Sequence, residues 1–482
     1  MLLKYLLEKT DIKVVAADMN IEVHGISFDS RTIMAGELFV AVKGFDSDGH
    51  RYIEEAAGKG AVCILCEEAP TIAAPYVTVG DSRKALAAVS AAWFRYPASE
   101  LRLVGVTGTN GKTTVTDLIK QLIEKCIGAK VGLVGTNRNM IGERELPTER
   151  TTPESYETQK LLRVMADEGC QYAVIEVSSH ALQLHRVHGI EFEVGVYTNL
   201  SPDHLDFHDS MDDYAKVKSS MFSHCRHAVI NIDDEYAHIM ASGAAQPVMT
   251  YSTKDLSADL VGKDIKLRMN RVEFCALAVG SLNRTLLNIP GIFSVYNALA
   301  AMSAVMLLGV EIERAAAVMQ TCGAVKGRAE VVPTGMDFTV LIDYAHTPDA
   351  LEKIIQTARG FAQGRVITLF GCGGDRDKTK RPLMGAAAAK LSDYTVITSD
   401  NPRTEEPGAI IRDILVGIGK KQKAYRVIEN RREAIYWALG NAQPGDVLIL
   451  AGKGHETYQV FGKEKTHFDE REVVAEFFGR EE

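Results

Sequence analysis

The chain has 482 residues, 46% of them hydrophobic and 24% charged, which is typical of a soluble globular protein with several domains. Its formal net charge of −9 argues against a nucleic-acid or anionic-membrane partner, because neither would be attracted. Lys4 and Glu8 interrupt the amphipathic N-terminus, and no stretch approaches the roughly 18 apolar residues that cross a bilayer. We therefore expect no signal peptide and a cytoplasmic location.

The eight cysteines are scattered along the chain, and the sequence has a single C-x-x-C, formed by Cys63 and Cys66. This pair lies in an apolar run that is typical of a buried strand. With no second pair nearby, a place in the core is favoured over zinc or redox chemistry. The pattern suits a reducing compartment.

The first hundred residues alternate short strand candidates, at 38–42 and 61–65, with helical stretches. Two polar clusters stand out, at 28–31 and 44–50, and the residues alone favour two surface turns. Residues 96–99 look like a linker. We predict domains at 1–99, 100–326 and 327–482.

The second domain opens with the pattern of a phosphate-binding loop. A short apolar strand at 101–106 is followed by a glycine loop, and apolar residues at helical spacing follow over 115–125. Such a loop presents backbone N–H groups and a helix N-terminus to phosphate oxygens, and a lysine and a threonine hydroxyl reach the phosphates and Mg²⁺. The strict motif has glycine where this chain has Val106, but the strand and helix on either side meet the context test. The predicted ATP-binding residues are Gly108, Thr109, Asn110, Gly111, Lys112, Thr113 and Thr114.

Further strand candidates at 172–177, 194–198 and 228–231 alternate with helices, which predicts a mainly parallel sheet with helices on both faces. Ligands of such sheets gather at the carboxyl ends of the strands. Glu176 lies at one such end, and we expect it to hold Mg²⁺ rather than to be a solvated loop residue. The acids and histidines of 203–208 fit ligands and structural hydrogen-bonders equally well. On charge patterning alone, Lys218 is an ordinary exposed helix lysine.

The last domain repeats the alternation, with strand candidates at 339–342, 366–370, 394–398 and 447–450. Polar clusters follow each of them. The cluster that begins at Gly371 lacks the third glycine of a dinucleotide fingerprint, so an NAD site is rejected. Arg403 and Arg376 offer planar forks that suit a carboxylate of an anionic substrate, although structural ion pairs would use the same residues.

Taken together and in order, these motifs resemble one family over nearly the whole chain, the ATP-dependent muramyl ligases of peptidoglycan synthesis. The matching residues are 29–31, 107–114, 151–154, 176–180, 203–206, 327–328, 343–348, 373–377, 400–403 and 452–456. The resemblance implies an α/β protein of three domains. These are a small N-terminal α/β domain that binds the uridine nucleotide, a central phosphate-loop ATPase-type domain with a mainly parallel sheet, and a C-terminal Rossmann-like domain that binds an amino acid.

The resemblance also implies a role for each matching residue. The UDP-N-acetylmuramoyl-L-Ala-D-Glu substrate would contact Phe28, Ser30, Phe45, Asp46, Ser47, Thr151, Thr152, Ser178 and Arg186. ATP would contact Asn297, Arg328 and Asp343 in addition to the loop. Lys218, counted from His204, would be carbamylated by CO₂ and would bind Mg²⁺ together with Thr113, Glu176 and His204. Catalysis would rest on Lys112, Glu176, His204 and Lys218. The amino-acid substrate would contact Arg376, Asp400, Asn401, Pro402, Arg403, Gly452 and Glu456.

The implied reaction is amide formation driven by ATP. The D-glutamate γ-carboxylate would attack the γ-phosphate to give an acyl phosphate, and the amine would then displace phosphate. The Asp-Asn-Pro-Arg motif favours meso-diaminopimelate as the added amino acid, because the second carboxylate of diaminopimelate would pair with Arg403. The alternatives are L-lysine, or another ligase of the muramyl and folylpolyglutamate superfamily. Some members carry glutamine where this chain has Leu184. We expect a monomer whose C-terminal domain closes over the site to exclude water.

Two alternative functions from other classes of protein are also consistent with the phosphate loop. A phosphate-loop kinase would release a phosphorylated product and no amide. A nucleotide-binding regulator would not turn over at all, and it would not need the clustered Glu176 and His204. Formation of an amide product separates the three.

Overall fold

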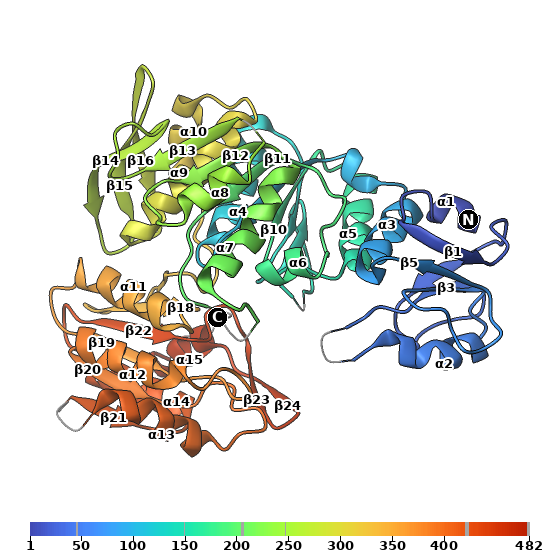
Figure 1. Cartoon of the computed structure of the whole chain (residues 1–482). Helices are drawn as coiled ribbons and strands as arrows, with labels where there is room; N and C mark the ends of the chain where they lie inside the picture. The colour runs from blue at the N-terminus through green and yellow to red at the C-terminus, as the bar shows by residue number, and fades with distance from the viewer. Residues whose placement is uncertain (45–46, 149, 204–206, 246, 420–423, 480–482) are drawn as a thin grey trace.

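The computed structural model describes residues 1–44, 47–148, 150–203, 207–245, 247–419 and 424–479. Figure 1 shows an N-terminal domain in blue and a C-terminal domain in orange and red, each lying against the central domain in cyan to yellow. The predicted three-domain α/β fold is confirmed. The exact boundaries at 99 and 326 stay predictions.

The N-terminal domain is a small α/β layer whose sheet has the order β1-β5-β4-β3-β2, with β1 antiparallel to β5. Its strands are β1 (Ile12–Ala16), β2 (Gly25–Ser27), β3 (Glu37–Val40), β4 (Cys63–Cys66) and β5 (Tyr76–Val79). Its helical segments are α1 (Leu3–Leu6), η1 (Gly49–Tyr52), α2 (Ile53–Gly58), α3 (Ser82–Trp93) and η2 (Pro97–Ser99). Every residue of β4 is buried, and its two cysteines are free thiols, so their predicted place in the core is confirmed.

The central domain is built on a sheet of order β16-β15-β14-β13-β12-β11-β6-β10-β7-β8-β9. Its strands are β6 (Arg102–Thr107), β7 (Val131–Val134), β8 (Asn139–Ile141), β9 (Arg144–Leu146), β10 (Tyr172–Glu176), β11 (Phe192–Tyr197), β12 (Cys225–Asn231), β13 (Val248–Ser252), β14 (Leu260–Leu267), β15 (Val272–Ala278) and β16 (Ser281–Leu287). Its helical segments are α4 (Lys112–Ile127), α5 (Ser155–Asp167), α6 (Ser179–Gln183), α7 (Met211–Ser219), η3 (Ser220–His224), α8 (Ala237–Ser242), α9 (Ile292–Leu307) and α10 (Ile312–Met319).

The middle of this sheet is parallel, as predicted, and both of its ends are antiparallel. Strand β6 lies between β10 and β11 and is parallel to both, so the loop after β6 opens beside the carboxyl ends of its neighbours. Because helices cover both faces, β6 is apolar and buried from Leu103 to Thr107. The antiparallel meander β14-β15-β16 extends one end of the sheet, and the sequence analysis did not anticipate it.

The C-terminal domain has a sheet of order β17-β18-β22-β19-β20-β21, parallel except for the β17–β18 pair, and a hairpin β23-β24. Its strands are β17 (Glu330–Val332), β18 (Thr339–Asp343), β19 (Val366–Phe370), β20 (Tyr394–Ile397), β21 (Tyr425–Val427), β22 (Val447–Ala451), β23 (Tyr458–Phe461) and β24 (Glu464–His467). Its helices are α11 (Pro348–Arg359), α12 (Lys380–Leu391), α13 (Pro407–Ile418), α14 (Arg431–Asn441) and α15 (Glu470–Phe477).

Several helices of this domain begin with sequence signals that fix where they start. Thr347 caps α11 by accepting a hydrogen bond from the backbone N–H of Ala350, and Pro348 occupies the first helical position. Asn430 caps α14 in the same way through the N–H of Glu433. Each cap fixes the residue at which the preceding loop ends and the helix begins. No helix within the described ranges is long and apolar enough to cross a bilayer.

Candidate active site

The loop between β6 and α4 has the shape that its sequence predicts. Gly108 has φ of +145°, and a Cβ added there would lie 1.9 Å from Thr198 Oγ1, so no side chain fits. Gly111 has φ of +88° and begins α4. The N–H of Asn110 donates to Asn199 Oδ1 (3.1 Å), which ties the loop to the end of β11. The N-terminus of a sixteen-residue helix therefore opens toward whatever binds in this loop.

Two lysines converge on one carbonyl oxygen of this loop. The Nζ atoms of Lys112 and Lys218 donate to Gly108 O at 2.8 Å and 3.1 Å, and Lys112 also donates to Thr109 O. Lys218 lies on α7 and is only 1% exposed, so the interpretation of it as an exposed helix lysine is wrong. Burial, and secondarily the charge of Lys112, holds the pKa of Lys218 well below its ordinary value. Burial therefore favours the neutral form of this amine more than in an ordinary lysine.

Glu176 ends β10 and is buried rather than solvated. Its Oε2 accepts hydrogen bonds from Thr113 Oγ1 (3.1 Å) and Thr136 Oγ1 (2.9 Å), and its Oε1 accepts one from the Thr136 N–H (2.8 Å). Arg328, from the start of the C-terminal domain, also donates to Thr113 Oγ1 (3.1 Å). A carboxylate and a hydroxyl thus lie side by side next to the phosphate loop. We call the carboxyl ends of β6, β10 and β11 the phosphate edge.

The chemistry of this donor set fits Mg²⁺, which prefers carboxylate and hydroxyl oxygens and leaves its remaining positions to phosphate and water. Thr113 and Glu176 supply both oxygen types within hydrogen-bond distance of each other. Within the described ranges, no three His, Cys, Asp or Glu side chains gather closely enough to bind a metal. His204 lies outside the described residues, so its predicted part in the site stays a prediction.

A cavity of about 450 Å³ lies next to the phosphate edge, between the central and C-terminal domains. Its lining includes most of the predicted ATP residues, among them Asn110, Gly111, Thr113, Thr114, Asn297, Arg328 and Asp343. It also includes an apolar wall that the sequence analysis missed, formed by Leu267, Ile292, Phe293, Ala350 and Ile354. One signal could have revealed this wall. Ile292 and Phe293 form an apolar pair directly after Gly291, and Ile292 is 41% exposed at the start of a helix.

Arg328 and Asp343, two of the residues predicted to contact ATP, line this cavity. The Arg328 guanidinium lies 4.9 Å from the centroid of the Tyr344 ring, a cation–π distance. Asp343 accepts a hydrogen bond from the Ala329 N–H (2.7 Å), and burial raises its pKa although the charge of Arg328 opposes the rise. Gly327 just before them has φ of +71°, and a Cβ there would lie 2.1 Å from the backbone N of His455. Only glycine lets the chain pass this close to the backbone of His455 where it enters the C-terminal domain.

The residues predicted for the muramoyl dipeptide lie where the central domain meets the N-terminal domain. Thr152 Oγ1 donates to Glu176 O (2.6 Å), Ser178 caps α6, and Arg186 donates to Thr152 O (3.1 Å). Thr151 Oγ1 accepts from Thr136 Oγ1 (3.1 Å). These groups extend from Glu176 toward the N-terminal domain.

One glutamate at this junction neutralises arginines from both domains. Glu154 accepts from Arg186 (2.7 Å), Arg150 (2.8 Å) and, more distantly, Arg83 of the N-terminal domain (3.5 Å). The cluster keeps an excess of positive charge where an acidic substrate would cross between the domains.

The predicted uridine-binding residues are only partly described. The ring of Phe28 packs 6.3 Å from that of Tyr156 in α5, and Ser30 Oγ donates to Glu55 (2.9 Å). Ser47 is exposed, and Phe45 and Asp46 lie outside the described residues. Their role stays a prediction.

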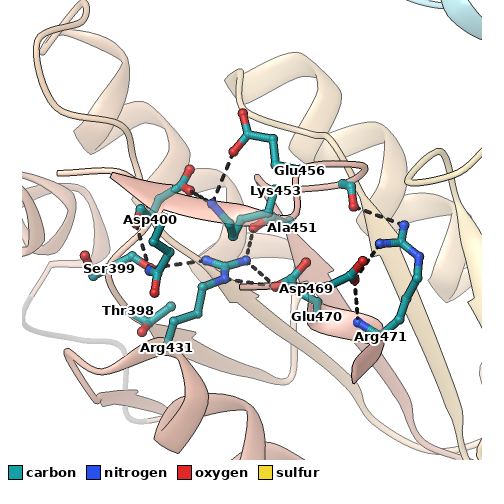
Figure 2. A network of polar contacts seen from close by, with 12 residues as sticks. Thr398, Ser399, Asp400, Arg431, Ala451, Lys453, Glu456, Asp469, Glu470 and Arg471 are labelled. Atoms are coloured by element: carbon teal, nitrogen blue, oxygen red, sulfur yellow. Dashed lines mark hydrogen bonds and ion pairs between the residues drawn. The ribbon is translucent and has the colours of Figure 1, made fainter. Parts of the chain in front are cut away.

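The second polar edge follows β20 and β22 of the C-terminal domain. We call residues 400–403 and 452–456 the acceptor edge. Asn401 Nδ2 donates to Glu456 Oε2 (2.8 Å), and Lys453 Nζ donates to Asp400 Oδ1 (3.3 Å), so the two loops are bonded to each other. Gly452 has φ of +109° and follows β22 directly. Figure 2 shows the part of this network around Asp400 and Lys453, with Arg431 reaching from α14 to Ser399 and Ala451 at the ends of both strands.

Arg403 has a strained backbone at this edge. It has φ of +52°, a left-handed conformation that an arginine rarely adopts, and backbone hydrogen bonds to the β23-β24 hairpin hold it there. Its Nη1 donates to Gly374 O (2.7 Å), and no carboxylate of the described residues pairs with it. A methyl group at Gly373 would meet both Arg403 Nη1 (3.0 Å) and Arg376 Cγ (3.9 Å), so the two predicted arginines lie together. The backbone of Pro402 packs directly against Gly374, where an added Cβ would lie 1.8 Å from the Pro402 carbonyl oxygen.

Comparison with known proteins places these features in one family. The models described as "Mur ligase family, catalytic domain", "Mur ligase middle domain" and "Mur ligase, glutamate ligase domain" match residues 22–101, 106–305 and 327–454. The chain is 48% identical over 473 residues to the UDP-N-acetylmuramoyl-L-alanyl-D-glutamate--2,6-diaminopimelate ligase of Caldanaerobacter subterraneus, with 97% of each chain covered. It is 45% identical over 481 residues to an enzyme of the same name from Clostridium acetobutylicum, with 99% of each covered.

Solved structures agree with this result. A structure of a UDP-N-acetylmuramoyl-L-alanyl-D-glutamate--2,6-diaminopimelate ligase matches with a TM-score of 0.73 and 31% identity over 99% of both chains. A Mycobacterium tuberculosis folylpolyglutamate synthase has a TM-score of 0.67 at 18% identity, with 83% of this chain and 96% of the other covered, and so shares the fold. The chain belongs to the Mur ligase family, whose members are ATP-dependent ligases that form amide bonds.

Proposed function

We propose that this protein joins meso-diaminopimelate to the D-glutamate γ-carboxylate of UDP-N-acetylmuramoyl-L-Ala-D-Glu, using ATP, during the synthesis of peptidoglycan precursors. The observation that carries this proposal is the acceptor edge, where the guanidinium of Arg403 has no carboxylate partner among the described residues and lies close enough to Asp400 for its charge to lower the pKa of that carboxyl. Full-length relatives that bear the name of this activity support it. We expect a monomer that acts in the cytoplasm.

The phosphate edge would bind ATP. The loop from Gly108 to Thr114 would surround the phosphates with backbone N–H groups, and the apolar wall beside Phe293 would cover the base. Lys112 donates to carbonyls of its own loop in this structure and would turn to the β- and γ-phosphates instead. Arg328 bridges to Thr113 from the C-terminal domain, so phosphate binding there would link the two domains.

Thr113 and Glu176 would hold Mg²⁺, which when bound supplies charge neutralisation for the transferring phosphoryl group. Lys218 is suited to carbamylation, because CO₂ reacts with a neutral amine and burial lowers the pKa of this amine. Conversion to the carbamate would also replace a repulsion between Lys218 and Lys112 with an attraction, since the two share one carbonyl. The family pattern assigns His204 to the same site.

The muramoyl dipeptide would extend from the N-terminal domain to this edge. Arg186, Ser178, Thr151 and Thr152 would orient the D-glutamate so that its γ-carboxylate meets the γ-phosphate in line, while Phe28, Ser30 and the loop through Ser47 would hold the uridine nucleotide. Attack would give an acyl phosphate and ADP. The amine of the acceptor would then displace inorganic phosphate and lose a proton.

The acceptor edge would bind the far end of diaminopimelate. Arg403 would form a paired hydrogen bond with its second carboxylate, and Asp400, Asn401 and Glu456 would contact its second ammonium. Arg376, Pro402 and Gly452 would shape the same pocket. L-Lysine has the ammonium but no second carboxylate, and would leave Arg403 without a partner. Because an acyl phosphate hydrolyses readily, we expect the C-terminal domain to close over the site, and scattering profiles that are equal with and without an ATP analogue and acceptor would contradict this.

The test is phosphate release with ATP, Mg²⁺, bicarbonate and the UDP-muramoyl dipeptide, with meso-diaminopimelate or L-lysine added in parallel. We expect release that depends on diaminopimelate and a matching heavier UDP-peptide in the mass spectrum. Removing bicarbonate should lower the rate if Lys218 is carbamylated. Release with lysine alone would keep the ligase but overturn the acceptor, and release with neither would overturn the proposed function.

Arg403→Ala sharpens the acceptor assignment. We expect the KM for diaminopimelate to rise about 100-fold or more with little change in the KM for ATP, because a charge-assisted pair is lost. Arg412→Ala, an exposed arginine on α13, is the matched control. An unchanged KM for diaminopimelate would refute the role of Arg403.

A further inference from the structure

Lys453 is a fully buried ammonium that the proposed reaction does not use. It follows β22, and its Nζ donates to Glu456 Oε2 (3.1 Å), Asn401 Oδ1 (3.1 Å) and Asp400 Oδ1 (3.3 Å). Figure 2 shows the ammonium between the Asp400 and Glu456 carboxylates. Burying a lysine is costly unless its charge is used, so this position calls for an explanation.

Lys453 is not needed merely to hold the two loops together. Arg431 already ties the strand ends, with donations to Ala451 O (2.8 Å) and Ser399 O (3.4 Å). Gln459 donates to Asp400 O (2.9 Å), and the Val460 N–H donates to Asn401 Oδ1 (3.1 Å). The loops therefore have neutral and charged supports that do not involve Lys453.

Counting charges at the acceptor edge shows what Lys453 changes. Asp400 and Glu456 contribute two negative charges, and Lys453 cancels one of them. Arg431 pairs with Glu470 and adds no net charge, and Tyr344 and Tyr458, which also face Glu456, are neutral because burial raises their pKa. One negative charge is thus left among these groups, beside the positive site that Arg403 and its neighbour Arg376 form.

We propose that Lys453 determines acceptor specificity by adjusting this charge, so that the acceptor edge matches an amino-acid end that carries one ammonium and one carboxylate. The inference rests on the proposed function and deepens it. With Lys453 present, one negative and one positive site face the zwitterionic end of diaminopimelate. Without it, two carboxylates face the substrate and favour an end that carries ammonium alone, as in L-lysine, over one that also carries a carboxylate.

The two carboxylates differ in a way that makes the idea testable by pH. Burial raises the pKa of Glu456, and the charge of Asp400 adds to the rise. Burial would also raise the pKa of Asp400, but the charges of Lys453 and Arg431 hold it below its ordinary value. If Lys453 is removed, Glu456 should therefore take up the proton first, and a protonated Glu456 restores the original charge. The effect of the substitution should then be small at low pH and grow as the pH rises.

The test is a competition in which both acceptors, at equal concentration, react in one mixture with wild-type enzyme, Lys453→Met, and Lys453→Met/Glu456→Gln. The ratio of diaminopimelate to lysine product in the mass spectrum does not depend on the active fraction of each preparation. We expect the ratio to fall about tenfold or more in Lys453→Met, since like charges then face the carboxylate. It should fall further between pH 6.5 and 9, and it should recover in the double variant, whose charge is restored.

A product ratio in Lys453→Met that equals the wild-type ratio across this pH range would overturn the inference alone. If wild-type enzyme forms no diaminopimelate product, the proposed function fails and the inference fails with it. Thermal unfolding checks that each variant is folded. If Lys453→Met is insoluble, Lys453→Gln keeps a donor at the same position and must show the same change in ratio for the inference to stand.

Discussion

The phosphate edge and the acceptor edge are both loops at the carboxyl ends of parallel strands, yet they are held in opposite ways. At the phosphate edge, the amines of Lys112 and Lys218 donate to a carbonyl of the loop itself, and a ligand would replace those bonds. At the acceptor edge, buried cations and carboxylates bond to one another before any ligand arrives. The first edge gains its charge partners on binding, whereas the second is pre-organised by them.

The largest effect should come from breaking the pre-organised edge. Arg431 and Glu470 form a fully buried pair with a contact of 2.8 Å. Arg431→Met leaves Glu470 buried and unpaired, and we expect the C-terminal domain to lose about 3–5 kcal/mol of stability. Trp437 lies on the same helix, so its fluorescence during urea unfolding, in a Trp93→Phe background, reports on this domain. The KM for the acceptor should rise as well.

The double variant Arg431→Met/Glu470→Met is the control for this measurement. It removes both charges and should recover most of the lost stability. If the single and double variants unfold alike, the pair does not pre-organise the edge, and the contrast between the two edges is wrong.

At the phosphate edge, the corresponding substitution should leave the fold intact and impair turnover. Lys112→Met removes the cation that would neutralise the transferring phosphoryl group, and we expect kcat to fall about 10²- to 10³-fold. Burial lowers the pKa of Lys112, and the negative charge of a bound phosphate would favour its charged form. Phosphate release is the measurement, and Lys125→Met, which removes an exposed lysine of the same helix, is the control. A stability loss as large as that of Arg431→Met would erase the difference between the edges.

The two edges also differed in how far the sequence predicted them. The phosphate loop is local, so residues 107–114 with their strand and helix predicted both the geometry of Gly108 and the direction of α4. Lys218 was misjudged because its burial depends on packing against that loop, 110 residues away in sequence. Arg431 and Glu470, 39 residues apart, carry no local signal at all.

Two other features could not be predicted from the sequence, for related reasons. The antiparallel meander β14-β15-β16 was missed because edge strands with mixed polarity lack the apolar runs that mark buried parallel strands. The apolar wall of the cavity combines residues of the central domain with Ile354 from α11, so it exists only once the two domains meet.

The smallest effect concerns a contact between the phosphate edge and the C-terminal domain, which also carries the acceptor edge. Asp349, at the start of α11, accepts hydrogen bonds across the domain boundary from Asn110 (2.9 Å) of the phosphate loop and from Ser201 (3.0 Å). These bonds are half-exposed, so Asp349→Ala should cost roughly 0.5–1.5 kcal/mol of interdomain affinity. We expect the KM for ATP to change by a few-fold, and the ligand-free radius of gyration in solution scattering to increase slightly.

Glu352→Ala removes a second acid from the same helix, so it separates the loss of the Asn110 and Ser201 bonds from a general change in charge. If Asp349 only neutralises Lys353, its neighbour at 2.8 Å, the two variants should behave alike. If the contact with Asn110 couples the edges, only Asp349→Ala should alter ATP binding, and the further variant Asn110→Ala should then add little to it. Additive effects of Asp349→Ala and Asn110→Ala would show that the phosphate edge takes up ATP independently of the C-terminal domain. In that case, closure would have to be driven by the acceptor edge alone.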